Sequence, residues 1–176
     1  MVKSSSSIRR DVEKVLADHG IASPPVPVEY IARALGVTVK YEPFSGELAG
    51  MLITADGTNV IGVNSSHHFN RQRFTIAHEL GHLILHHREM ERVHIDRSLV
   101  HRRDNISGLA IDPKEIEANR FAAELLMPYS MLIADIEGVN DVEDVDEISL
   151  LAKRYLVSAL AMTNRITNLL HLHKHW

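Results

Sequence analysis

The 176-residue chain contains no cysteine, so it can form no disulfide, and a bound transition metal would have to be held by histidine and carboxylate side chains. No apolar run approaches the ~20 residues that cross a bilayer, and residues 1–7 lack the apolar centre of a signal peptide. The formal net charge of −4 argues against a broad phosphate-binding surface. With 45% hydrophobic residues, we expect a cytoplasmic globular protein with one main core and no membrane partner.

The most informative stretch is residues 74–82, whose centre has the pattern His-Glu-x-x-His. Apolar residues at helical spacing surround it and predict a buried helix over about residues 70–86. His78 and His82 are one turn apart on that helix, so both imidazoles can converge on one ion. A hydrolytic zinc site has three protein ligands and a water whose pKa the metal lowers to about 7. Glu79 would lie beside that water and could take its proton.

The same predicted helix contains one glycine, Gly81, and two arginines, Arg71 and Arg73. Gly81 weakens the helix by about 1 kcal/mol relative to alanine, which indicates close approach of another backbone. Arg71 and Arg73 precede the motif, and we interpret them as solvated or structural residues. An arginine near a carboxylate-rich site could also order a ligand.

The chain ahead of the motif predicts two helices and a small sheet. Ser7 is a plausible N-cap for a helix over residues 8–18 that ends at His19-Gly20, and a second helix covers residues 28–35. We expect strands at residues 37–41, 48–54 and 59–63, with Asp56-Gly57 as the hairpin turn between the last two. In this largely antiparallel sheet, residues 45–51 form either an exposed edge that pairs with substrate backbone or a covered strand.

A second helix with metal-binding potential begins at Asp112-Pro113 and is stopped by Pro128. It carries three candidates for a third metal ligand, which are Glu115, Glu117 and Glu124. Glu115 also fits a capping box, which needs no metal. Asn119 shares a face with Glu115 and could support that residue or the motif helix. Spacing alone leaves the third ligand open.

Residues 87–111, between these two helices, are polar and irregular. A loop of this length directly after the metal helix is a candidate flap over the site. His94 and His101 could stabilise an oxyanion, although we interpret both as solvated loop histidines.

Two stretches taken together resemble the ImmA/IrrE family of metallopeptidases. They are R-Q-R-F-T-I-A-H-E-L-G-H and, later in the chain, E-I-E-A-N-R-F-A-A-E-L-L-M-P. The resemblance spans residues 46–128 and implies that Glu115 is the third zinc ligand, with Glu117 as the fallback. It also implies a bacterial cytosolic protein that cleaves or inactivates a helix-turn-helix repressor of the XRE type, often on phages, integrative elements or toxin-antitoxin loci. Larger relatives carry a DNA-binding domain on the same chain, whereas here we expect a separate partner.

Residues 148–166 near the C-terminus resemble a helix-turn-helix, with Ser158 capping its second helix. Lys153, Arg154 and Arg165 form a thin positive footprint, and the acidic residues 141–147 ahead of them would repel phosphates. We therefore favour a packing or partner-docking role over DNA binding. The tail with His171, His173 and His175 is interpreted as polar rather than as a second metal site.

These observations predict an α+β fold in which a small antiparallel or mixed sheet packs on a zincin-like helix. Residues 1–128 would form the metallopeptidase domain, with a helical part at residues 1–36, and residues 129–176 a helical C-terminal part. In this interpretation His78, His82 and Glu115 hold Zn²⁺, and Glu79 is the catalytic base of an endopeptidase that cuts an XRE-type repressor. The alternative is a non-catalytic anti-repressor or stress-response regulator that binds repressor or DNA.

Overall fold

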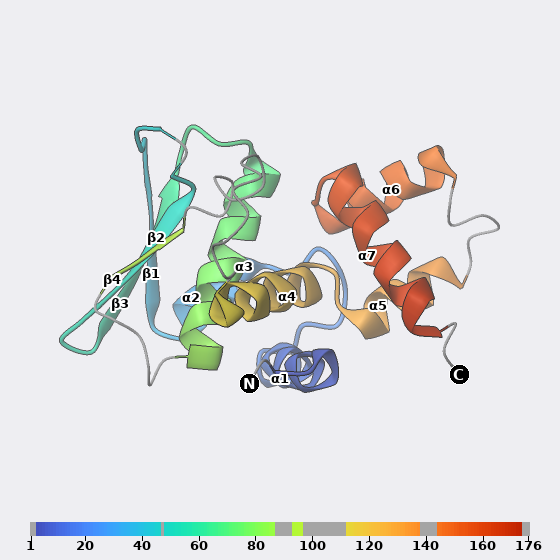
Figure 1. Ribbon diagram of the computed structural model, residues 1–176, viewed down its shortest axis with the longest axis horizontal. Helices are drawn as coiled ribbons and strands as arrows, with labels where there is room; N and C mark the ends of the chain where they lie inside the picture. Colours follow the sequence, from blue (N-terminus) through green and yellow to red (C-terminus); the bar gives the residue numbers. More distant parts are fainter. Residues whose placement is uncertain (1–2, 47, 87–92, 97–111, 138–143, 174–176) are drawn as a thin grey trace.

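The computed structural model describes residues 3–46, 48–86, 93–96, 112–137 and 144–173, with backbone alone for residues 93–96 and 171–173. Within these ranges the chain forms seven helices and four strands, so the predicted α+β class is confirmed. The elements are α1 (Ser5–Asp18), α2 (Val28–Ala34), β1 (Val37–Glu42), β2 (Gly50–Ala55), β3 (Thr58–Asn64), α3 (Phe69–His86), β4 (Val93–Asp96), α4 (Pro113–Leu126), α5 (Tyr129–Ile136), α6 (Val145–Tyr155) and α7 (Ala159–His173). In Figure 1 the described helices lie on one side of the sheet.

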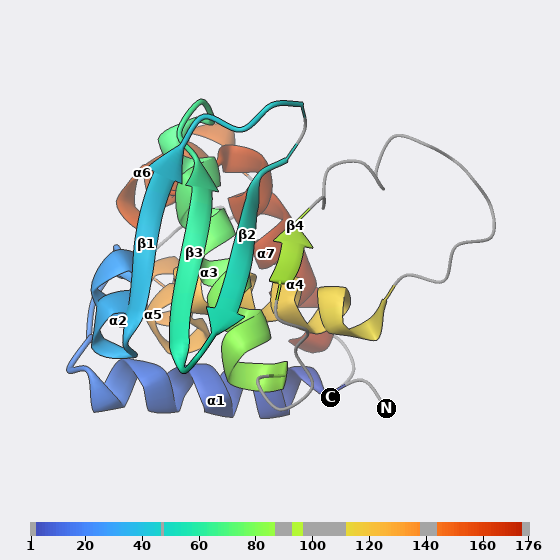
Figure 2. The ribbon, with the colours of Figure 1, turned by 90° about the vertical axis from the view of Figure 1, so that its left-hand side faces the viewer.

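The sheet is mixed and has the strand order β1-β3-β2-β4 (Figure 2). β1 runs parallel to β3, whereas β2 is antiparallel to both of its neighbours. β2 and β3 form a hairpin in which Asp56 and Gly57 take φ angles of 49° and 75°. Positive φ at both central residues is the geometry of the tight hairpin turn that an Asp-Gly pair favours, so the predicted hairpin is confirmed.

The structure decides between the two sequence interpretations of the strand at residues 45–51 and corrects one other prediction about the sheet. β2 is an internal strand, because Gly50 pairs with Val63 of β3 on one side and with Asp96 of β4 on the other. Residues 50–51 are therefore paired on both sides, and for this part of the stretch the covered alternative holds. β4 lies at an edge of the sheet, so the prediction of an irregular loop is wrong for residues 93–96. A four-residue strand added to an existing sheet needs little pattern of its own.

The rest of the proposed flap lies outside the described residues, as do His101 and the side chain of His94. The same holds for residues 138–143 and for the side chains of His171, His173 and His175. Their predicted roles stay predictions.

Helix α1 begins three residues earlier than expected. The side chain of Ser4 caps it by accepting a hydrogen bond from the backbone nitrogen of Ser7 at 3.2 Å, so the prediction of Ser7 as the cap is wrong. Serines at positions 4–7 are chemically equivalent caps, and only the packing of the helix selects one of them. The predicted apolar face is buried and α1 packs against α4 (Figure 1).

Helices α3 and α4 cross at the centre of the molecule (Figure 1). An alanine Cβ at Gly81 of α3 would lie 3.1 Å from Cα and 3.2 Å from the carbonyl oxygen of Ala118 in α4. The prediction that Gly81 permits close approach of another backbone is therefore confirmed. The fully buried side chains of Leu80 and Phe121 extend the hydrophobic core around this crossing. None of the helices in the described part of the chain is both long and apolar enough to cross a membrane.

Helices α6 and α7 form the predicted two-helix arrangement with a short turn. Leu156 takes a left-handed conformation at the end of α6, and Ser158 caps α7 by accepting a hydrogen bond from the backbone nitrogen of Ala161 at 3.1 Å. Arg154 pairs with Asp135 at 2.9 Å, and Arg165 pairs with Glu124 at 2.6 Å. Two of the three cations of the helix-turn-helix pattern therefore pair with carboxylates of other helices in the same chain, which favours a packing role.

Candidate metal centre

His78 and His82 of α3 meet Glu115 at the start of α4. Their Nε2 atoms are 3.1 Å apart, and the Glu115 carboxylate oxygens lie 3.4 Å from Nε2 of His78 and 3.2 Å from Nε2 of His82. Ligand atoms bound about 2.0–2.1 Å from a tetrahedral zinc ion lie about 3.4 Å apart. The three side chains therefore have the spacing of a metal-binding set without any rearrangement.

Asn119, one turn after Glu115, sets the orientation of His78. Its side-chain oxygen lies 3.2 Å from Nδ1 of His78. Because an amide oxygen can only accept, Nδ1 carries the hydrogen and Nε2 keeps a lone pair. That lone pair faces Nε2 of His82 and the Glu115 carboxylate, where the two imidazoles are almost fully buried. Two imidazole nitrogens and a carboxylate that converge in this way are a donor set that suits a divalent cation, so the residues fit a metal ion.

The other two acidic candidates of α4 point elsewhere. Glu117 and Glu124 are rotated from Glu115 by about 200° and 180° around the helix axis. Glu117 contacts Nε2 of His86 at 3.2 Å and accepts a hydrogen bond from the backbone nitrogen of Lys3. Glu124 accepts a hydrogen bond from the backbone nitrogen of Tyr129 at 2.9 Å. Of the three candidates, the structure brings Glu115 to the histidines, and its role as a ligand stays a prediction.

Glu79 is fully buried on α3, directly after His78. Its place as the catalytic base stays a prediction.

Helix α3, which carries His78 and His82, packs closely against the sheet at Gly50. A Cβ at this position of β2 would lie 2.3 Å from Cγ2 of Thr75 and 2.8 Å from the carbonyl oxygen of Gly62. Only glycine lets β2 pass this close to α3, one turn before His78. The sheet therefore fixes the position of the helix that carries both histidines.

Arg73 has a structural role, as one of the two sequence interpretations had it. Its side chain is buried and its Nη2 donates a hydrogen bond to the carbonyl oxygen of Val26 at 2.9 Å. Burial lowers the pKa of the Arg73 guanidinium from its usual value. Arg71 instead lies with its guanidinium carbon 5.7 Å from the centre of the Phe74 ring, beside a cavity.

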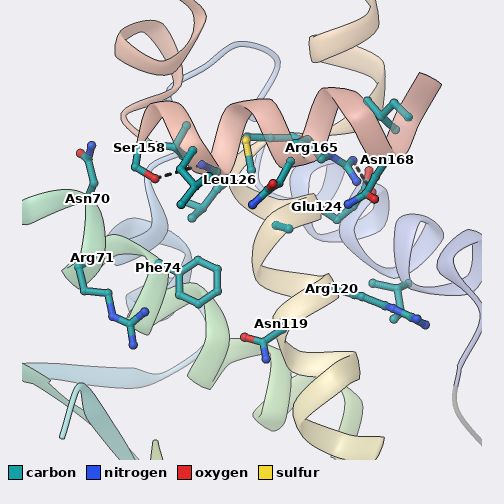
Figure 3. Close-up of a pocket in the computed structure, with 18 of the residues that line it drawn as sticks. Asn70, Arg71, Phe74, Asn119, Arg120, Glu124, Leu126, Ser158, Arg165 and Asn168 are labelled. Carbon is teal, nitrogen blue, oxygen red and sulfur yellow. Dashed lines mark hydrogen bonds and ion pairs between the residues drawn. The ribbon is translucent and has the colours of Figure 1, made fainter. Parts of the chain in front are cut away.

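This cavity of about 980 Å³ lies between α1, α3, α4 and α7, and its lining includes Phe74 and Asn119, which both lie beside His78. Figure 3 shows the ring of Phe74 between α3 and α7. That ring is 6.2 Å from the imidazole of His78, and Asn119 lines the cavity while it contacts the same imidazole. Sequence reasoning missed the cavity. One signal was available, because Asn164 and Asn168 share a face of α7 at a spacing of one turn.

Comparison with known proteins agrees with this geometry. A peptidase family model described as the IrrE N-terminal-like domain matches residues 32–167. Among solved structures, a Mycobacterium tuberculosis transcriptional regulator is similar, with a TM-score of 0.63 and 19% sequence identity over 92% of this chain and 55% of that chain. At this identity the likeness shows the fold alone, and this chain spans about half the length of that protein. No curated protein matches at a significant level.

The family model covers residues on both sides of the metal centre, from α2 to α7. It includes both helices that carry the histidine and glutamate side chains described above. The family suggested by the two sequence motifs is therefore confirmed. This chain belongs to the family of peptidase proteins with an IrrE N-terminal-like domain.

Proposed function

We propose that this protein is a zinc-dependent endopeptidase that inactivates a transcriptional repressor of the helix-turn-helix (XRE) type by cutting it. The observation that carries the proposal is the cluster of His78, His82 and Glu115, whose ligand atoms all lie within 4.8 Å of one another. Membership of a peptidase family supports hydrolysis, and the regulator named among similar structures supports a link to transcription.

In this proposal His78, His82 and Glu115 hold the ion, and Asn119 keeps the His78 ring in place through its Nδ1 hydrogen. When bound, a zinc ion supplies a Lewis acid that makes water more acidic and polarises the carbonyl of the bond to be cut. Glu79 accepts the proton of the attacking water and then delivers it to the nitrogen of the leaving amine. Two imidazoles and one carboxylate are a usual donor set for a hydrolytic zinc site.

The proposal also assigns the parts of the chain and their setting. Residues 1–128 would form the catalytic part, and residues 129–176 the part that covers one side of it. We place the protein in the cytoplasm, where a repressor substrate would be found, and in a regulatory pair on a phage, a mobile element or a toxin-antitoxin locus.

A second function is a non-catalytic anti-repressor that keeps the metal fold to bind its repressor or DNA. The similar solved structure is named a transcriptional regulator, which favours this alternative. The buried carboxylate of Glu79 favours the enzyme, because binding alone would not require an acid beside the first histidine. We therefore propose the enzyme first.

The test is incubation of the purified, zinc-loaded protein with the helix-turn-helix repressor encoded beside its gene. Mass spectrometry should show new repressor fragments with the wild type and none with Glu79→Gln, which keeps the size of the side chain. Equal cleavage by both proteins would remove Glu79 from the mechanism. Release of intact repressor from its operator at equal stoichiometry, without fragments, would establish the non-catalytic alternative.

A further inference from the structure

The cavity between α1, α3, α4 and α7 begins one helical turn away from the metal ligands. Phe74 precedes His78 by one turn on α3, and Asn119 follows Glu115 by one turn on α4, so both helices lead from the metal ligands into the cavity. A volume of about 980 Å³ lies at the upper end of the ~300–1,000 Å³ usual for ligand sites. The cavity therefore has room for several residues of a peptide rather than for one side chain.

The charge of the cavity is positive, although the chain as a whole has a formal net charge of −4. Its lining contains four arginines, Arg9, Arg71, Arg120 and Arg165, and one acidic residue, Glu124. Glu124 pairs with two of these cations. Its Oε2 lies 2.6 Å from Nη2 of Arg165, and its Oε1 lies 3.8 Å from Nε of Arg9. One carboxylate cannot neutralise two guanidinium groups. The lining therefore attracts negative charge.

Arg120 adds to this charge from an exposed position on α4. Among the described residues it has no acidic partner. A carboxylate that enters the cavity can pair with Arg120 without breaking an ion pair among the residues that the structure describes.

Side-chain amides provide the second chemical feature of the lining. Asn70, Asn119, Asn164 and Asn168 all line the cavity. The oxygen of Asn119 is occupied by His78, and among the described residues its amide nitrogen has no acceptor. A carboxamide offers two donors and one acceptor and so matches the N–H and C=O groups of an extended peptide backbone. Apolar side chains such as Phe74 and Leu126 complete the lining (Figure 3).

We infer that this cavity binds an acidic segment of the polypeptide substrate, next to the bond that is cut. The inference rests on the proposed function and names the substrate class that the site selects. The arginines select carboxylate side chains, the amides hold the backbone, and the apolar side chains pack against those of the peptide. A nucleic-acid duplex is too wide to enter a cavity of this size, which favours a polypeptide over DNA.

The experiment uses full-length zinc-loaded Glu79→Gln protein, so that binding is measured without cleavage. The immobilised protein is offered a synthetic random decapeptide library, and bound peptides are identified by mass spectrometry. We expect enrichment of Asp and Glu over Asn, Gln, Lys and Arg. A captured peptide with three acidic residues should bind about eight-fold more tightly than its Asn or Gln version, because each exposed pairing contributes a factor of about two.

The matched controls are Arg120→Glu in the cavity and Arg33→Glu on the exposed surface of α2, both in the Glu79→Gln background. Arg120→Glu should weaken binding of the acidic peptide, and Arg33→Glu should leave it unchanged. Capture of acidic and basic peptides in equal amounts, or equal effects of the two variants, would overturn the inference. Displacement of the peptide by a lower concentration of single-stranded decanucleotide would overturn it in favour of nucleic acid.

These outcomes separate the inference from the proposed function. Selective binding of acidic peptides by Glu79→Gln, together with no cleavage of any peptide by the wild type, would refute the endopeptidase and keep the binding site. Cleavage by the wild type with no preference for acidic residues would refute the role of the cavity and keep the endopeptidase.

Discussion

Replacing Gly81 by alanine tests whether the contact between α3 and α4 holds the metal ligands together. The new Cβ would lie 3.1 Å from Cα and 3.2 Å from the carbonyl oxygen of Ala118, and 3.2 Å from Cβ of Phe121. Two of these atoms belong to the backbone of α4, so the helices must separate by a few tenths of an ångström. Alanine gains about 1 kcal/mol in helix propensity, whereas overpacking costs about 1–3 kcal/mol.

The expected net effect of Gly81→Ala is a loss of up to about 2 kcal/mol in the free energy of unfolding. Because His82 is the next residue and Glu115 lies one turn before Ala118, we also expect zinc affinity to fall about ten-fold. Urea unfolding of the metal-free protein measures the first effect, and competition with a chromophoric chelator measures the second. Ala17→Gly, on the exposed surface of α1, gives the propensity effect alone.

The reasoning about the helix contact would be refuted by a Gly81→Ala protein that is about 1 kcal/mol more stable than the wild type. In that case propensity alone would decide the result, and α3 and α4 would not be in close contact. Unchanged zinc affinity would further show that the spacing of the two helices does not control the site.

Three further predictions test separate contacts. Asn119→Ala should lower zinc affinity about 10–100-fold in a chelator competition, whereas Asn164→Ala should not change it; equal affinities would show that Asn119 does not orient His78. Glu124→Gln should destabilise the protein by about 2–3 kcal/mol in urea, because it leaves Arg165 without its carboxylate, and a neutral result would refute the ion pair. Tyr155→Phe removes a 2.8 Å hydrogen bond to Asp135 and should cost about 1 kcal/mol at pH 7. Burial, together with this bond, raises the pKa of Tyr155. Above about pH 10 the folded wild type therefore keeps a tyrosine proton that the unfolded chain loses, and its free energy of unfolding should fall. The decrease should be smaller in Tyr155→Phe, which has no hydroxyl to ionise at this position.

The metal helix could be predicted from sequence because its signals are local. The spacing of His78 and His82 places them on one face whatever the rest of the fold does. The start of α4 was equally clear, since Asp112 accepts a hydrogen bond from the backbone nitrogen of Lys114 at 2.9 Å, as its place before Pro113 predicts. The β2–β3 hairpin could be predicted for the same reason, because the adjacent residues Asp56 and Gly57 favour its tight turn.

The choice among Glu115, Glu117 and Glu124 could not be made from spacing, because it depends on how α4 is rotated against α3. That rotation is set by contacts such as Gly81 with Ala118, which join residues far apart in the sequence. The position of β4 is non-local for the same reason, since its pairing partner β2 precedes it by a whole helix. The cavity needs residues of α1, α3, α4 and α7 to form, and the spacing of Asn164 and Asn168 on α7 cannot by itself predict which helices face them.

The most direct test of the metal centre is the zinc content of two isosteric variants, measured by equilibrium dialysis and elemental analysis. Wild type and Glu117→Gln should each bind one zinc ion per chain, because Glu117 contacts His86 instead of the two ligand histidines. Glu115→Gln should lose most of this binding, since its carboxylate lies 3.2 Å from Nε2 of His82. Full zinc content in Glu115→Gln, or its loss in Glu117→Gln alone, would contradict the account.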